Sequence, residues 1–408
     1  MSNREEEIKK TQEIIINEDV INETIAEVDY KAKAKKNSKK SLFGLLWVLV
    51  NIILVVVVGF TAFNGGDNKA PFSEMIKIWF AKENAIFWFL AMGCGLLTLL
   101  VEALKLYIMI YRTTKLKKMK LSFKASVLTR YYDNITPLGS GGQPFEIYYL
   151  KKGGVPGAES MYLPVASFFL NQLAFLFLCI FAFIFKATNE HLFKSDTLNN
   201  VFMVMAYIGA AFSIFIPVMI FAISFMPRLR AKIIKICVRF SYKFKFIKNK
   251  GAATREANKL VNRYKKSLFT LAKSKGTLLI IGLLSIIYEV SICSIPYFVI
   301  RACGLNANYL VSLCTCVFTY AAISFIPTPG NSGAAEVSFM SLFTMIGTQY
   351  IYWAMSYWRF CCYFLLVIIG VIVVVTDIVR NSRNRKKELM NSEYVQKYTN
   401  KAKENDAN

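Results

Sequence analysis

The sequence of 408 residues is 55% hydrophobic, has a mean hydropathy of +0.40 and carries a formal net charge of +24. Its apolar residues occur in long runs, which excludes an ordinary soluble domain and predicts an all-α integral membrane protein with polar tails. The basic residues lie between these runs, where they would face anionic lipid, so nucleic acid is not expected as a partner.

Few residues are available for metal or nucleophilic chemistry. The single histidine, His191, falls in a polar stretch, and the nine cysteines lie mostly inside the apolar runs. This argues against a histidine metal site, a Ser-His-Asp site and an extracellular disulfide framework. No phosphate-binding loop of the type G-x-x-x-x-G-K-[ST] occurs. We therefore expect no metal, no cofactor and no catalytic residues.

Residues 1–40 are polar and are predicted to form a cytoplasmic tail. Six apolar runs follow that are long enough to cross a bilayer, which needs about 20 helical residues. They cover residues 42–63, 85–111, 161–185, 201–226, 277–300 and 352–378. A transmembrane domain is thus predicted over 41–380, with a basic loop at 227–276 and a basic tail at 381–408. The start of that loop interleaves basic and apolar residues and could lie on the membrane surface or be a plain solvated helix.

A short motif, T-P-x-x-S-G, occurs twice, 192 residues apart. The copies are Thr136-Pro137-Leu138-Gly139-Ser140-Gly141 and Thr328-Pro329-Gly330-Asn331-Ser332-Gly333. Proline and glycine interrupt helices, and interrupted backbone at membrane depth is tolerated only where protein or a wet cavity surrounds it. Around the motifs, residues 122–150 and 309–346 each predict two half-helices joined by a break, which suits a re-entrant hairpin. Residues 309–326 alone could nearly span, so eight spans are also compatible with the sequence.

The distribution of lysine and arginine predicts the orientation of the chain. Basic residues are concentrated at 112–130, 228–275 and 380–387, which we therefore place in the cytoplasm. The two predicted hairpins then enter from opposite sides of the membrane. A span, a broken hairpin and a span thus occur twice with inverted orientation, which is the plan of many secondary transporters.

The breaks also predict a chemistry. Ser140 to Gln143 has the spacing of a capping box and Pro144 suits a first helical turn, while Asn331 and Ser332 could cap the second restart. Half-helices that begin near mid-membrane would present free N–H groups, and such ends bind phosphate. The alternative is a pair of tight turns without a ligand.

Charged residues inside or beside the apolar runs are the second signal. Glu102, Lys105, Glu289 and Arg359 lie within runs, and each costs at least about 2.5 kcal/mol at the bilayer centre. Glu102 and Lys105, three residues apart, could simply pair. The candidate substrate-binding residues are Glu102, Arg130, Asp133, Asn134, Pro137, Gly139, Ser140, Gly141, Gly142, Gln143, Glu146, Glu289, Pro329, Asn331, Ser332, Gly333, Glu336 and Arg359.

The segments Pro137–Pro144, Pro327–Glu336 and Tyr357-Trp358-Arg359 resemble signatures of the lysylphosphatidylglycerol synthase transmembrane region family. The resemblance covers roughly residues 42–380, and the family includes the flippase half of the multiple peptide resistance factor. It implies a bacterial cytoplasmic-membrane protein that moves an aminoacylated or related phospholipid between leaflets. The sequence departs from the family pattern at Gln143, Asn331 and Asn171-Gln172.

The sequence is compatible with three functions. The first is a lipid translocase whose partners are membrane phospholipids, with the half-helix ends and Arg359 at phosphate and the glutamates at a cationic headgroup. The second is the membrane component of a lysyltransferase that makes lysylphosphatidylglycerol. The soluble synthase domain is expected to be absent, so this activity would need a partner synthase. The third is a membrane scaffold that transports nothing. A homo-oligomer is left open.

The charge distribution generates a prediction about topology. With both termini in the cytoplasm, a membrane-impermeant thiol reagent should label His191→Cys from outside intact cells and should not label Lys250→Cys. Permeabilised cells provide the control, because both positions should then react. Labelling of position 250 in intact cells would refute the orientation.

Overall fold

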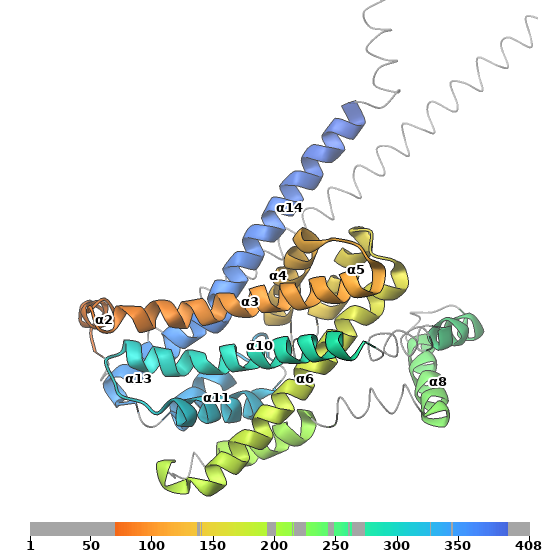
Figure 1. Cartoon of the computed structure of the whole chain (residues 1–408). Helices are drawn as coiled ribbons and strands as arrows, with labels where there is room; N and C mark the ends of the chain where they lie inside the picture. The colour runs from red at the N-terminus through yellow and green to blue at the C-terminus, as the bar shows by residue number, and fades with distance from the viewer. Residues whose placement is uncertain are drawn as a thin grey trace, which may run out of the picture. The chain divides into compact units, whose positions relative to one another are not determined.

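The computed structural model describes residues 70–136, 139, 141–193, 201–213, 215, 226–243, 249–259, 262, 274–326, 328–343 and 346–390. The chain divides into two compact units, one of residues 1–57 with 380–408 and one of residues 58–379. The second unit contains the membrane helices and the site. Its regular structure in the described residues is entirely helical, as predicted (Figure 1).

Four helices are long and apolar enough to cross a membrane, and they confirm four predicted spans. They cover residues 85–114, 159–188, 275–302 and 349–383. The first three belong to α3 (Ala85–Thr114), α6 (Gly157–Thr188) and α10 (Lys275–Ala302). The predicted span at 42–63 lies outside the described residues. Of the span predicted at 201–226, the structure describes an apolar helix at residues 201–213.

The fourth crossing helix is built from three consecutive pieces. α13 (Thr348–Arg359) runs into one wide turn, Phe360–Phe364, and continues as α14 (Leu365–Met390). In the wide turn the backbone hydrogen bonds skip one residue more than in an α-helix, a feature often found at functional sites. Arg359, Cys362 and Tyr363 at this turn all face the cavity described below.

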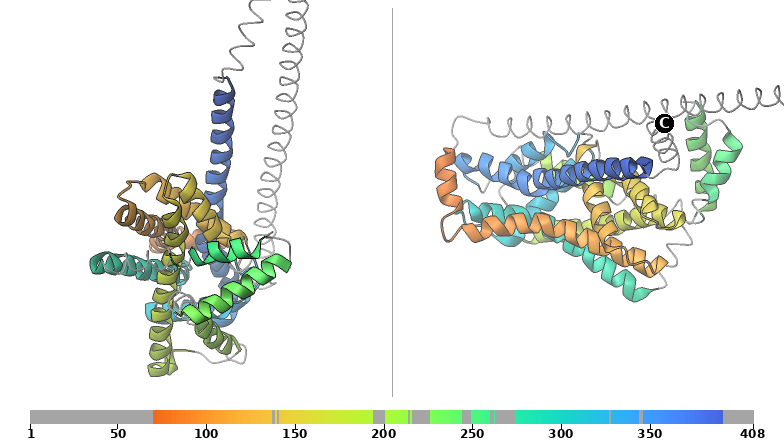
Figure 2. Two further views of the ribbon diagram at one scale, coloured as in Figure 1. Left: turned by 90° about the vertical axis from the view of Figure 1, so that its right-hand side faces the viewer. Right: turned by 90° about the horizontal axis from the view of Figure 1, so that it is seen from above.

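Helices α3 and α10 lie side by side and run in opposite directions (Figures 1 and 2). At one end Arg301, in the last turn of α10, stacks on Phe87 near the start of α3, with 4.8 Å from the guanidinium carbon to the ring centre. At the other end Ile281 of α10 packs in one buried cluster with Met109 and Ile110 of α3. The antiparallel pair sets the two halves of the chain in opposite orientations.

Each half contains one broken hairpin, as predicted. The first consists of α4 (Met119–Ile135) and α5 (Gly142–Lys152), and the second of α11 (Tyr309–Ile323) and α12 (Ala334–Leu342). α5 has 11 residues and α12 has 9, so at 1.5 Å per residue neither can cross a bilayer. The first hairpin follows the end of α3 and the second follows the end of α10. They therefore begin at opposite ends of the antiparallel pair, which is the inverted arrangement expected from the sequence.

The helix cap of the second restart differs from the expectation. The residue that precedes α12 is Gly333, and its N–H donates to Oε2 of Glu336 at 2.7 Å, so neither Asn331 nor Ser332 caps the helix. Instead Asn331 adopts a left-handed backbone conformation, and the carbonyl of Ser332 accepts a hydrogen bond from the Thr328 hydroxyl at 3.0 Å. At the first restart Gly141 precedes α5, while Ser140 lies outside the described residues.

The described residues include two further helices, α2 (Phe72–Trp79) and α8 (Pro227–Lys243). α2 precedes α3 and packs Trp79 against Trp353 and Tyr357 of α13, at ring-centre distances of 6.0 and 5.6 Å. α8 belongs to the predicted basic loop and exposes Arg228, Lys232 and Lys235. Neither helix contributes to the cavity.

The crossing of α3 with the last helix predicts an effect on stability. A Cβ atom at Gly95 would collide with the carbonyl oxygen of Cys361, whereas one at Gly93 would meet nothing within 4 Å. Gly95→Ala should therefore lower the free energy of unfolding by about 1–3 kcal/mol through overpacking. Gly93→Ala, its matched control, should leave it unchanged or raise it, because alanine favours helix. Thermal unfolding in detergent checks this, and equal midpoints for the two variants would contradict the close helix contact.

Candidate functional site

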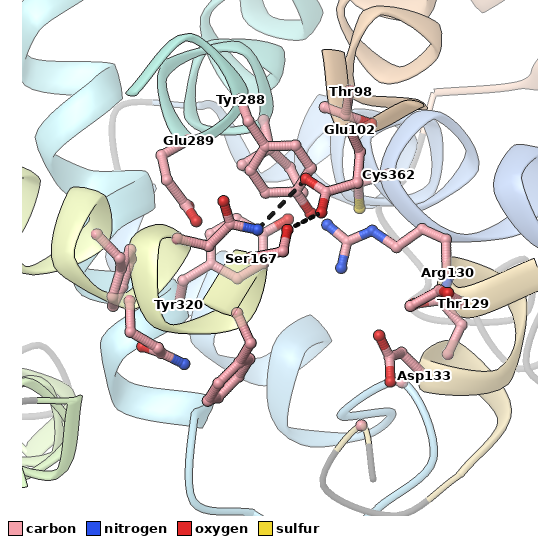
Figure 3. A pocket seen from close by; sticks show the side chains of 18 of the residues that line it. Thr98, Glu102, Thr129, Arg130, Asp133, Ser167, Tyr288, Glu289, Tyr320 and Cys362 are labelled. Atoms are coloured by element: carbon pink, nitrogen blue, oxygen red, sulfur yellow. Dashed lines mark hydrogen bonds between the residues drawn. The ribbon is translucent and has the colours of Figure 1, made fainter. Parts of the chain in front are cut away.

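Both breaks open onto one cavity of about 360 Å³ in the second unit (Figure 3). It is lined by side chains of α3, α4, α5, α6, α10 and α11, and by Arg359, Cys362 and Tyr363 of the last crossing helix. Gly139 of the first break and Gly330 and Asn331 of the second reach the same space. Segments almost 200 residues apart in the sequence thus form one site.

The first break is held by two side chains of α4. The N–H of Gly142 donates to Oδ1 of Asp133 at 2.8 Å, and the N–H of Gly141 donates to the Thr136 hydroxyl at 2.8 Å. Glycine is required at position 142, because a Cβ atom there would overlap the Asp133 carboxylate. The N–H group of Gly142, the first residue of the restarted helix, and that of the preceding Gly141 therefore already have acceptors within the protein.

The second break is held by a glutamate and by an arginine from the last crossing helix. Oε2 of Glu336 accepts from the N–H of Gly333, and its Oε1 accepts from Nε of Arg359 at 2.7 Å. Nη2 of Arg359 also donates to the Gly330 carbonyl at 3.1 Å and to Oγ of Ser332 at 3.3 Å. The side chain of Arg359 is 5% exposed and that of Glu336 15%. This ion pair fixes the second break to the last helix.

A third polar cluster joins α3 to α6. Nζ of Lys105 is fully buried and lies 2.7 Å from Oε2 of Glu102, which confirms the expected local pair. Lys105 also donates to Oδ1 of Asn171 at 2.5 Å. Ser167 donates to Oε1 of Glu102 at 2.8 Å and Nδ2 of Asn171 to its Oε2 at 3.4 Å, and Figure 3 draws both of these bonds. Glu102 therefore has partners on both helices.

Three charged groups at the cavity are less completely paired. Arg130 places its guanidinium carbon 5.0 Å from the ring centre of Tyr288, and no described carboxylate lies within ion-pair distance of it. Glu289 lines the cavity from the middle of α10 and forms no ion pair or hydrogen bond with the described part of the chain. Glu146 is 6% exposed, and the Thr129 hydroxyl is its hydrogen-bond partner.

Two of the carboxyl groups lie on the first hairpin, outside the four crossing helices. Burial raises the pKa of Asp133 to about 6, although the Arg130 charge and the Gly142 N–H act in the opposite direction. Burial also raises the pKa of Glu146 to about 8, and the nearby Glu102 and Asp133 carboxylates add to the effect. At pH 7 Asp133 is therefore mostly ionised, whereas Glu146 is mostly protonated.

The structure gathers most of the predicted site residues. Ten line the cavity: Glu102, Arg130, Asp133, Asn134, Gly139, Gln143, Glu146, Glu289, Asn331 and Arg359. Gly141, Gly142, Ser332, Gly333 and Glu336 form the two breaks behind the lining, and Pro329 precedes the lining residue Gly330. Pro137 and Ser140 lie outside the described residues.

Sequence reasoning missed several polar residues that line the cavity. Ser126 and Thr129 extend the predicted Arg130 and Asp133 into a stripe along α4 at spacings of three and four residues, and Ser167 and Asn171 form a shorter one on α6. The signal was present, because polar residues four apart in an apolar helix share a face. Ser126 is 2% exposed, and its hydroxyl has no partner within the described ranges.

Taken together, the fold and the cavity define a polytopic helical membrane protein with two interrupted helices around a buried polar site. The chain belongs to the lysylphosphatidylglycerol synthase TM region family, whose model matches residues 46–370. It is also 23% identical over 273 residues to a UPF0104 membrane protein of Archaeoglobus fulgidus, a match that covers 64% of this chain and 77% of the relative. No solved structure gives a significant match.

The Arg359–Glu336 ion pair at the second break generates a prediction about stability. Arg359→Gln leaves the Glu336 carboxylate buried without its partner, which should cost about 3–5 kcal/mol. Adding Glu336→Gln should recover part of that loss, because the amide oxygen can still accept from the Gly333 N–H. Lys259→Gln, which opens the exposed Lys259–Glu256 pair, should have no measurable effect. Thermal unfolding of the single and double variants tests the coupling, and strictly additive losses would contradict it.

Proposed function

We propose that this protein is a lipid translocase, which binds a phospholipid headgroup in the cavity and moves the lipid between leaflets. The observation that carries the proposal is the meeting of two broken hairpins, from inverted halves, at one polar cavity inside an apolar bundle. Transporters with inverted repeats place their substrate sites at such interruptions. Family membership supports a membrane domain linked to lipid chemistry.

The size of the cavity suits a headgroup and not a whole lipid. About 360 Å³ is at the lower end of the range of small-molecule sites. The acyl chains would remain in the surrounding membrane, against apolar side chains that the helices expose on their outer faces, such as Phe177, Leu279 and Ile372. The headgroup alone would then cross the apolar bundle through the polar interior.

Arg130 is the group that we assign to the lipid phosphate. The N–H groups of Gly141, Gly142 and Gly333 were candidates, but each already has an acceptor within the protein. Arg359 is occupied by Glu336, whereas Arg130 stands in the cavity without an ion-pair partner among the described residues. An arginine can bind a phosphate through two parallel hydrogen bonds.

Glu146 and Glu289 are the groups that we assign to an amine on the headgroup. Both line the cavity and neither has a basic residue within ion-pair distance in the part of the chain that the structure describes. An aminoacylated or zwitterionic phospholipid carries a phosphate and an ammonium group and would satisfy both signs of charge. A buried carboxyl group without a basic partner is costly to ionise, and an ammonium group beside it would stabilise the ionised form, so such a headgroup would be bound favourably.

The two alternative functions predict different experimental results. A membrane component of a lysyltransferase would be recognised by radiolabelled lysine passing from lysyl-tRNA into phosphatidylglycerol in the presence of a partner synthase. A scaffold that transports nothing would tolerate any substitution inside the cavity. Within the described residues Arg130 and Glu289 have no ion-pair partner and the Ser126 hydroxyl has no hydrogen-bond partner, which favours a ligand over a scaffold because buried polar groups normally have partners.

The proposed role of Arg130 predicts the outcome of a transport experiment. Purified protein in liposomes should accelerate the flipping of fluorescent aminoacylated phosphatidylglycerol, measured by quenching of the outer leaflet. Arg130→Gln should reduce the rate at least about tenfold, because loss of a charge-assisted contact of about 1.5–3 kcal/mol weakens binding by that order.

Arg112→Gln is the matched control, since Arg112 is exposed on α3 outside the cavity and should retain the parent rate. Parent and Arg130→Gln proteins that flip lipid at the same rate would remove Arg130 from the site. Liposomes with no lipid flipping above the protein-free rate, for any headgroup tested, would refute the translocase.

A further inference from the structure

Each break is held by a carboxylate that accepts a hydrogen bond from a glycine N–H, and we call this contact a clasp. The two clasps differ in one respect. In each, a carboxylate accepts a hydrogen bond from a glycine N–H at the helix restart, Asp133 from Gly142 and Glu336 from Gly333. At the second break the remaining carboxylate oxygen is bound by Arg359. At the first break the corresponding arginine, Arg130, stands nearby on the same helix and forms no ion pair with Asp133.

The carboxylate of the second clasp is therefore paired with an arginine, whereas the carboxylate of the first clasp is not. Arg359 is buried and makes three hydrogen bonds to the second break, so it has little capacity left for a ligand. Arg130 and Asp133 instead both reach into the cavity from α4, as Figure 3 shows. The charged groups that a ligand could reach and alter, Arg130 and Asp133, thus lie on the first hairpin.

Asp133 is surrounded by few groups that set its charge. Arg130 on its own helix favours the ionised form, and so does the hydrogen bond from the Gly142 N–H. Glu102 of α3 and Glu146 of α5 lie close enough to oppose it. Arg359 lines the same cavity from the last helix, but Glu336 neutralises its charge. Arg130 is therefore the main positive charge that keeps Asp133 ionised.

We infer that a lipid phosphate at Arg130 and a proton at Asp133 bind together, so that each phospholipid is carried with a proton. This inference rests on the translocase proposed above and names the ion that accompanies the lipid. The proton is taken from water and binds the Asp133 oxygen that does not accept from Gly142, so no bond of the lipid changes. The clasp on the first break can therefore persist in both protonation states.

The sign of the effect follows from linkage. Because Asp133 in the empty site has a pKa of about 6, it is mostly ionised at pH 7. A phosphate on Arg130 neutralises the charge that favours this ionised form, so the pKa rises and a proton is taken up. Reciprocally, protonation of Asp133 frees Arg130 from the attraction of a neighbouring anion, so phosphate binds more tightly as the pH falls. The dependence is strongest between the pKa values of the empty and the occupied site.

The test uses a soluble short-chain phosphatidylglycerol, whose phosphodiester does not titrate in this range, and full-length protein in a maltoside detergent that contains no phosphate. From pH 7.5 to pH 5.5 the affinity should increase roughly twentyfold, the size expected if binding raises the pKa by about two units. A pH indicator in weak buffer should report uptake of most of one proton per bound lipid at pH 7. The proton count needs no variant.

Asp133→Asn imitates the protonated acid and keeps an oxygen for the Gly142 N–H. It should bind the lipid with equal affinity at both pH values and take up no proton. Glu190→Gln, an exposed change outside the cavity, should behave like the parent. A parent protein whose affinity does not depend on pH, or an Asp133→Asn variant that retains the parent's dependence, would overturn the inference.

Proteoliposomes separate this inference from the proposed function. An imposed pH gradient should change the rate of lipid flipping by the parent protein and not by Asp133→Asn. Flipping that proceeds equally with and without the gradient would leave the translocase intact and remove the proton. Absence of both lipid binding and flipping at either pH would refute the two together.

Discussion

Backbone that leaves the helical path inside an apolar bundle must find hydrogen-bond partners within the protein, because lipid offers none. The structure depends on this constraint at both breaks. Each restart is satisfied by one acidic side chain that accepts from a glycine N–H, and glycine at 142 is needed for the carboxylate to approach. The acidic residues that flank the motifs are thus part of the backbone's own hydrogen bonding before they have any role toward a ligand.

The same constraint explains how charge is distributed around the cavity. A buried carboxylate used as a cap brings a negative charge that has to be compensated. Arg359 compensates Glu336, and Lys105 compensates Glu102. Among the described residues, the cavity charges without an ion-pair partner are concentrated on the first hairpin and on α10, at Arg130, Asp133, Glu146 and Glu289. We therefore assign ligand binding and changes of protonation to the first half of the chain, and the permanent ion pair that holds the second break to the second half.

The sequence predicted the features that depend on local pattern. Four crossing helices, the two breaks and the Glu102–Lys105 pair all follow from hydropathy, from proline and glycine, or from a spacing of three residues. Contacts between distant segments were not predictable in the same way. The Arg359–Glu336 pair joins residues that no helical period relates, and Asn171 meets Lys105 only because α6 packs on α3. Nor could the sequence show that the N–H groups of Gly141, Gly142 and Gly333 are already bound, since the geometry of the turn decides which acceptor they reach.

The wide turn at Phe360–Phe364 has a consequence for the last crossing helix as a whole. It holds one residue more than an α-helical turn, so the segments before and after it are rotated by about 100° relative to an uninterrupted helix. Arg359 before the turn and Leu366 after it are both buried, one at the cavity and the other in a cluster with Leu99 and Val127. A single helical wheel at 100° per residue would place these two residues, which are seven apart, within about 20° of each other, although the wide turn directs them to different neighbours. Among relatives, a one-residue deletion at this point would mark a helix that is regularly wound and in which the segments before and after the turn keep these two directions.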